Sequence, residues 1–235
     1  MILSAQSILY DGRVLEQIPP GRFPLLPQGN DWIILFDTSF RPKARDRSIR
    51  KGYNDFGYNA EQFKEIDSFL KKNNNVRTVA GVLEELRTGI KGLKGILEGK
   101  CLGPLNRVIC YESRVANHLS RCLTGEGLGE RDKEDFQGIC MDLEPTALSY
   151  ARGYGVKIKP PFTDIKLMAA AGAYSLLFNN QSKKVTIASA DVPLLKTWAR
   201  MTRDSGLPFG KTYVSDSLVG LTVPTQDYRT ANHQS

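Results

Sequence analysis

The sequence predicts an α/β fold built around a parallel sheet, and the main evidence is two apolar segments of the same form. The first, residues 32–36, leads directly into Asp37, and the second, residues 185–188, leads into Asp191 after two small residues. Short segments that are apolar throughout are typical of strands buried on both faces, as in parallel sheets. Ligands of such sheets bind beyond the carboxyl ends of the strands, so we expect both aspartates at one edge where chemistry can take place.

The composition is that of a soluble globular protein. Apolar residues make up 41% and charged residues 24% of the 235-residue chain, and this length favours one main domain with additions. No segment approaches the ~18 apolar residues of a membrane span, and the first ten residues lack the cationic head of a secretory signal. We therefore expect a cytoplasmic protein without membrane contact. The net charge of +7 favours polyanionic partners.

The sequence gives no support to three common kinds of site: a zinc site, a hydrolase triad and a phosphate-binding loop. The four cysteines form no C-x-x-C pair, and the spacing of Cys110, His118 and Cys122 matches no zinc module, so we expect free, buried thiols. The two histidines lie in no motif with a serine or cysteine, which leaves a hydrolase triad without support. The segment 206–212 imitates a phosphate-binding loop but has one residue too few between its glycines.

Turn and linker signals divide the chain into three parts. Residues 1–30 form an N-terminal β-hairpin extension with a Pro-rich linker, because Asp11-Gly12 between apolar stretches favours a type I′ turn. Residues 31–225 form the main domain, and residues 226–235 form a disordered tail.

Helices and a short strand alternate in the first half of the main domain. Apolar residues at helical spacing predict a helix over 59–72, and a short strand follows over 76–79. The next helix has Val82 and Leu86 facing inward. Its continuation over 89–103 is left open because its internal glycines weaken a helix by ~1 kcal/mol each.

The second half of the main domain is organised around one apolar helix. Residues 165–178 are apolar on nearly all sides, so they form a helix buried against the sheet. Pro145 fits the first turn of the helix before it. The other elements expected in this half are a helix over 105–123, a Gly-rich flexible break over 125–130, a helix over 144–154, a helix over 194–201 and closing strands within 211–224.

Four carboxylates stand at the ends of expected elements: Asp37, Glu85, Asp164 and Asp191. If these ends meet at one edge of the sheet, several negative charges come together with no Lys or Arg inside the same motifs. Such a cluster persists only with bound cations, and hard oxygen ligands suit Mg²⁺ or Mn²⁺. A divalent ion there would activate water and stabilise a pentacovalent phosphate, which is the chemistry of phosphodiester hydrolysis.

Three of these carboxylates also have a purely structural explanation. Asp164 could cap the buried helix, Glu85 could belong to a solvated helix face, and Asp191 could start the turn before Pro193. Singly the four signals are weak, and their joint pattern is the basis of the metal-site hypothesis.

The same motifs resemble those of the PIN-domain nuclease family. The family pattern is an apolar strand ending in Asp-Thr, a helix start of the Val-Leu-Glu-Glu-Leu type, a Thr-Asp or Ser-Asp opening an Ala-rich helix, and a strand ending in Thr-x-Asp or Ser-x-Asp. The matching positions here are Asp37-Thr38, residues 82–86, Thr163-Asp164 and Ser189 to Asp191. The chain departs from the family at Ala190, where many members carry Asn, and in the extra length of residues 87–141.

This resemblance implies a PIN-like fold, in which a parallel sheet lies in an α/β/α sandwich, and an Mg²⁺- or Mn²⁺-dependent endoribonuclease activity. The implied catalytic and metal-binding residues are Asp37, Glu85, Asp164 and Asp191, with Thr38 and Ser189 as polar neighbours. The rival hypothesis is a non-catalytic nucleic-acid-binding or scaffold protein on the same fold. A homodimer and a regulatory protein partner both stay open.

A basic segment over residues 41–51 follows the first strand of the main domain and is a candidate for binding the RNA backbone. Its basic residues are Arg41, Lys43, Arg45, Arg47, Arg50 and Lys51, and the aromatic residues available to stack bases after it are Tyr53, Phe56 and Tyr58. The alternative is a solvated loop without RNA contact. Single-stranded and structured RNA are both candidate substrates.

Replacing Arg45 and Arg47 by alanine tests the basic segment. Each phosphate contact that is lost lowers the slope of log affinity against log salt by about 0.7–0.9. We therefore expect the double variant to bind RNA with a flatter salt dependence, measured by fluorescence anisotropy at several salt concentrations. An unchanged slope would show that these two arginines do not contact phosphates.

Overall fold

A computed structural model of the chain describes residues 6–10, 13–17, 32–38, 64, 66–97, 103–156, 158–160, 162–178, 183–189, 191–204 and 220–222. The Pro-rich linker, the basic segment 41–51, the aromatic residues after it, the segment 206–212 and the tail from residue 226 lie outside these ranges. What the sequence predicts for them therefore stays a prediction.

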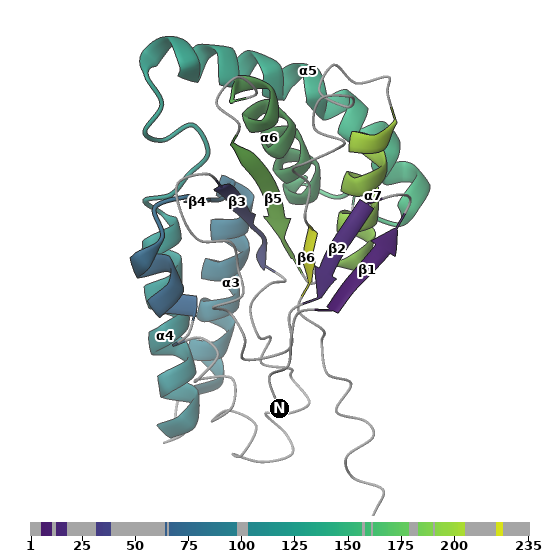
Figure 1. Cartoon of the computed structure of the whole chain (residues 1–235). Helices are drawn as coiled ribbons and strands as arrows, with labels where there is room; N and C mark the ends of the chain where they lie inside the picture. The colour runs from purple at the N-terminus through teal and green to yellow at the C-terminus, as the bar shows by residue number, and fades with distance from the viewer. Residues whose placement is uncertain are drawn as a thin grey trace, which may run out of the picture.

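The described strands form one sheet that is parallel except at one edge (Figure 1). The strands are β1 (Gln6–Tyr10), β2 (Arg13–Gln17), β3 (Trp32–Phe36), β4 (Val76–Arg77), β5 (Lys184–Ala188) and β6 (Gly220–Thr222). Their order across the sheet is β1-β2-β6-β5-β3-β4, and the pair β1–β2 is antiparallel while the other described pairs are parallel. The predicted α/β class with a parallel sheet is confirmed.

Strand β3 lies between β4 and β5 and is buried, because residues 33–36 are at most 8% exposed. Its pairing with β5 places Phe36 opposite Ala188, so the next residues, Asp37 and Ser189, leave the sheet at the same edge. The N–H of Asp37 donates to the carbonyl oxygen of Ala188 at 3.0 Å, which extends the pairing beyond the strand. The two predicted strands and their shared carboxyl edge are confirmed.

The N-terminal hairpin is confirmed and belongs to the main sheet. Strands β1 and β2 pair in a register that opposes Tyr10 and Arg13, which leaves two residues between them, as an Asp-Gly turn requires. The turn residues themselves lie outside the described ranges. Strand β2 then pairs in parallel with β6, so the hairpin extends the edge of the sheet rather than standing apart from it.

Two helices that pack against each other follow β4. Helix α3 (Ala80–Leu97) has Val82, Leu86 and Ile90 on its buried side. It continues through its glycines to Leu97, because the buried positions continue at helical spacing and packing outweighs the cost of ~1 kcal/mol per glycine. Helix α4 (Gly103–Leu119) packs against α3, and the pair extends below the sheet in the view of Figure 1.

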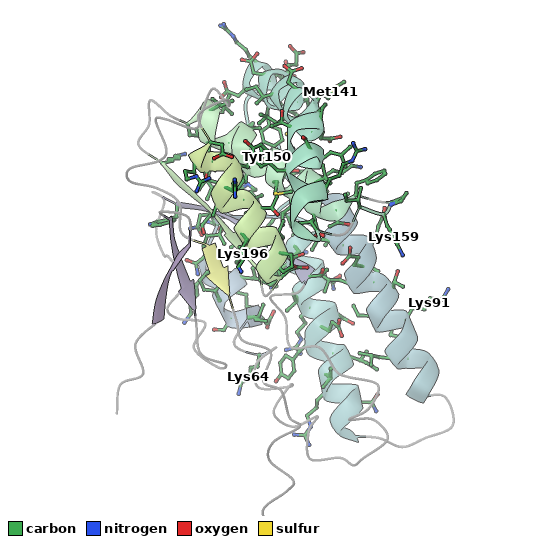
Figure 2. The ribbon with its side chains drawn as sticks, turned by 90° about the vertical axis from the view of Figure 1, so that its right-hand side faces the viewer. Lys64, Lys91, Met141, Tyr150, Lys159 and Lys196 are labelled. Carbon is green, nitrogen blue, oxygen red and sulfur yellow. The ribbon has the colours of Figure 1, made fainter. Side chains whose placement is uncertain are left out.

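The remaining helices pack on the sheet and on one another. Helix α6 (Thr163–Leu177) contacts β3 and β5, and helix α7 (Val192–Arg203) contacts β2 and β6. Residues 167–175 of α6 are all buried, which confirms the predicted apolar helix. Helix α5 (Glu130–Tyr154) packs against both of these helices, and the hydroxyl of Tyr150 on α5 donates to Asp204 at the end of α7 at 3.2 Å (Figure 2).

Helix α5 spans Glu130–Tyr154 and corrects the prediction of a shorter helix over 144–154. Pro145 lies inside the helix, where proline lacks the N–H that would bond the carbonyl of Met141. Both residues are exposed, with Met141 on the outer surface of α5, so water can reach that carbonyl (Figure 2). The helix continues because its inner face is buried. The buried residues of that face are Phe136, Leu143, Ala147 and Ala151.

The described cysteines are free thiols, as predicted, but the expectation that they are buried is wrong for Cys110. This residue is exposed because helical spacing places it on the outer face of α4 with Arg107 and Arg114. Cys122 and Cys140 are partly buried, and desolvation raises the pKa of the Cys140 thiol to about 12.

Two other predicted helices are confirmed in part. Residues 66–72 are helical, and the side-chain amide of Asn73 donates to the carbonyl of Phe69 at 2.7 Å at the end of this helix. Helix α4 ends at Leu119 rather than at residue 123. Among the described helices, none is long and apolar enough to cross a membrane.

Replacing Pro145 by alanine tests whether α5 is continuous. Inside a helix, alanine is more favourable than proline by about 3 kcal/mol. The replacement also gives the unfolded chain more conformational freedom, which lowers the gain in stability by about 1 kcal/mol. We expect the free energy of unfolding in urea to rise by about 2 kcal/mol. The control is Ser149→Ala, one turn later on the exposed side, which should gain at most about 0.5 kcal/mol. Equal gains in the two variants would mean that the helix is interrupted near Pro145.

Candidate carboxylate site

Asp37 follows β3 directly, and its carboxylate is held by a serine from the neighbouring strand. The hydroxyl of Ser189, the first residue after β5, donates to Asp37 Oδ2 at 2.7 Å. Asp37 is 3% exposed and Ser189 is fully buried. Because the parallel register of β3 and β5 places these residues side by side, the sheet itself positions the carboxylate.

Thr38 connects Asp37 to helix α3. The Thr38 hydroxyl oxygen lies 2.6 Å from Glu85 Oε2 and 3.3 Å from Asp37 Oδ1. A hydroxyl group has one proton, and the shorter contact has the better hydrogen-bond distance, so Thr38 donates chiefly to Glu85. Glu85 lies in the second turn of α3 and is exposed. The Thr38 hydroxyl therefore connects Asp37 and Glu85 at this edge of the sheet, and the catalytic and metal-binding roles of the two carboxylates stay predictions.

Asp191 caps helix α7 and is also connected to Asp37. Its Oδ1 accepts a hydrogen bond from the N–H of Leu194 at 3.2 Å, so Asp191 has a structural role, as a helix cap rather than as the start of a turn before Pro193. Its own N–H donates to the Ser189 hydroxyl oxygen at 2.9 Å. Ser189 thus contacts both aspartates, and the second carboxylate oxygen of Asp191 takes no part in the cap.

Asp164 does not cap helix α6, so that structural explanation is wrong. The helix begins at Thr163, and the capping position is held by Phe162, whose φ of 58° lies in the left-handed region. No side-chain cap bond is formed there, and Asp164 lies in the first turn. A carboxylate in the first turn interacts favourably with the positive end of the helix dipole.

The hydroxyl groups of Thr38 and Ser189 link these carboxylates. From the sequence, the two residues were predicted only to be polar neighbours of the site. The sequence signal was their position just beyond the ends of two buried strands, two residues after β3 for Thr38 and one residue after β5 for Ser189. Glycine at position 81 of α3 was also missed, although it lies against Thr163, the residue before Asp164. The sequence holds no signal for this contact, because it depends on how two helices approach each other.

Carboxylate oxygens are suitable ligands for Mg²⁺ or Mn²⁺. Each of these oxygens has more than one lone pair, so an oxygen that accepts a hydrogen bond from a hydroxyl group can still bind a cation. The grouping is less complete than the sequence suggested. Among the described residues, no three His, Cys, Asp or Glu side chains are grouped closely enough to hold a metal ion. The four-carboxylate metal site therefore stays a prediction.

The described histidine, His118, has a structural partner outside this site. Its Nε2 lies 3.4 Å from Asp67 Oδ1, and Lys71 Nζ lies 2.7 Å from Asp67 Oδ2. Asp67 is 4% exposed, so this cluster pairs a buried carboxylate with cationic or ring nitrogen atoms. It connects the helix at residues 66–72 to α4.

No protein-family model, curated protein or solved structure matches the chain significantly. The resemblance to the PIN-domain nucleases therefore stays a prediction from the short motifs.

Replacing Ser189 by alanine tests its role at the edge of the sheet. The variant removes a donor from the buried Asp37 carboxylate, and a hydrogen bond to a charged group contributes about 1.5–3 kcal/mol. We expect the free energy of unfolding to fall by that amount in urea titrations.

The matched control for this variant is Thr186→Val in the same strand. Thr186 is fully buried, and its hydroxyl has no hydrogen-bond partner among the described residues, so valine should leave the stability unchanged or raise it. A loss of similar size in both variants would show that Ser189 matters only through packing.

Proposed function

We propose that this chain is a metal-dependent endoribonuclease with a PIN-like α/β/α fold. One observation carries the proposal: the Thr38 hydroxyl contacts both Asp37 and Glu85, two carboxylates that are far apart in the sequence. Their meeting place is the carboxyl edge of a parallel sheet, where α/β proteins bind their ligands. The net charge of +7 supports a polyanionic substrate.

The proposed roles follow from the contacts. The residues that would hold Mg²⁺ or Mn²⁺ are Asp37, Glu85, Asp164 and Asp191. When bound, such an ion lowers the pKa of a water molecule and neutralises charge on a phosphate. Thr38 and Ser189 orient the carboxylates, because their hydroxyl groups fix the rotation of the Glu85 and Asp37 side chains. Residues 41–51 would bind the RNA backbone.

A second candidate function is a non-catalytic protein that binds nucleic acid or acts as a scaffold on the same fold. The observation that favours it is the absence of a group of three metal-binding side chains from the described part of the chain. The two candidates differ in one measurable property, because only the nuclease needs the Asp37 carboxylate and a divalent ion to act on RNA.

Cleavage of a labelled, structured RNA separates these functions. We expect the wild type to cleave the RNA with Mn²⁺ and not with EDTA. Asp37→Asn should lower the cleavage rate by more than about 100-fold, because replacing residues that only hydrogen-bond to metal ligands already lowers activity by about 10–100-fold. The matched control is Asp142→Asn, an exposed carboxylate on α5, which should cleave at the wild-type rate. RNA binding without metal-dependent cleavage would favour the scaffold, and equal cleavage by Asp37→Asn would contradict the proposed site.

A further inference from the structure

We propose that Gly81 and Thr163 form a positioning contact that sets the distance between helices α3 and α6, and with it the placement of Glu85 relative to Asp164. This inference rests on the proposed function, because it explains how two of the four carboxylates are held for one cation. Neither residue is proposed to touch the substrate or the metal.

The two helices approach more closely at Gly81 than a side chain would permit. A Cβ atom at position 81 would lie 2.6 Å from Thr163 Oγ1 and 3.3 Å from Cβ and Cγ2 of the same residue. Contacts of a Cβ atom below 3.0 Å essentially do not occur in proteins. Gly81 is not among the described glycines with a positive φ, so space rather than backbone conformation requires glycine here.

This contact lies next to both carboxylates. Gly81 and Glu85 are four residues apart on α3, so they share one face of the helix, a single turn from each other. On the other side, Thr163 directly precedes Asp164 in the first turn of α6. A shift of α3 away from α6 at Gly81 would therefore move Glu85 away from the helix start that holds Asp164.

Thr163 has the properties of a spacer, by which we mean a side chain that keeps two helices at a fixed distance. It is 5% exposed, and its hydroxyl has no hydrogen-bond partner among the described residues. A buried, unpaired hydroxyl destabilises a fold, so alanine would serve stability better at this position. Threonine is also β-branched, which limits its χ1 rotation to two favoured rotamers in a helix, and each of them leaves heavy atoms beside Cβ to fill the space next to Gly81.

Other glycines of α3 provide matched controls. Gly92 and Gly95 have no atom within 4 Å of the place that a Cβ would occupy, and both are exposed, in the part of α3 that carries Lys91 (Figure 2). Alanine at these positions favours the helix without touching α6. Of the three changes Gly81→Ala, Gly92→Ala and Gly95→Ala, only Gly81→Ala should therefore disturb the site.

The experiment measures Mn²⁺ affinity of the full chain by calorimetry, with circular dichroism to show that each variant is folded. We expect Gly81→Ala and Thr163→Ala each to weaken Mn²⁺ binding by about tenfold or more, the range typical of residues that orient metal ligands. In the double variant the alanine methyl replaces the lost threonine atoms, so affinity should return close to wild type. Gly92→Ala should bind as wild type does. RNA cleavage should show a lower kcat with unchanged KM for the two single variants.

The outcomes distinguish this inference from the function on which it rests. If the wild type binds Mn²⁺ and both single variants bind it equally well, the positioning contact is wrong and the proposed nuclease stands. If the wild type neither binds Mn²⁺ nor cleaves RNA, the proposed function fails, and the inference fails with it. If Gly81→Ala does not fold, Thr163→Ala decides alone, because it removes the spacer without adding an atom, and wild-type Mn²⁺ affinity in that variant overturns the inference.

Discussion

The parallel pairing of β3 with β5 is the constraint on which both the fold and the candidate site depend. In this pairing Phe36 lies opposite Ala188 at the ends of the two strands, so the next residues, Asp37 and Ser189, lie at the same edge of the sheet. A slip of one residue in this register would turn each side chain to the opposite face, because side chains alternate along a strand. The observed register therefore specifies the hydrogen bond between Ser189 and Asp37.

Much of the fold could be predicted because its central elements have unambiguous apolar patterns. Nearly continuous apolar segments predict buried elements, and the structure has them as the strands at 32–36 and 184–188 and as helix α6. The first half of α5 could not be predicted, because residues 130–135 are all charged and Pro145 is typical of a helix start. Burial of the inner face of α5 against α6 and α7 decides in favour of one long helix, and that information lies outside the local sequence.

The candidate site could be predicted to the level of its elements but not of its contacts. That Asp37 and Ser189 meet follows from two strands that end at one edge. That Thr38 donates to Glu85 depends on where α3 begins relative to β3, which no local pattern fixes. Asp164 shows the same limit, because aspartate is a residue type that favours the capping position, yet the helix begins at Thr163, two residues before the predicted start. The sequence thus indicates which groups are available, and the packing of helices on the sheet decides how they are used.

The start of α6 holds two local costs that the rest of the helix lacks. Among the described residues other than glycine, only Phe162 has a positive φ, and the next residue, Thr163, buries an unpaired hydroxyl. Each feature costs about 1–3 kcal/mol, a substantial share of the 5–15 kcal/mol by which a typical domain is stable. Such costs persist where position matters more than stability. Both costs lie within two residues of Asp164, and the proposed function accounts for them because it requires that carboxylate to be held in one place.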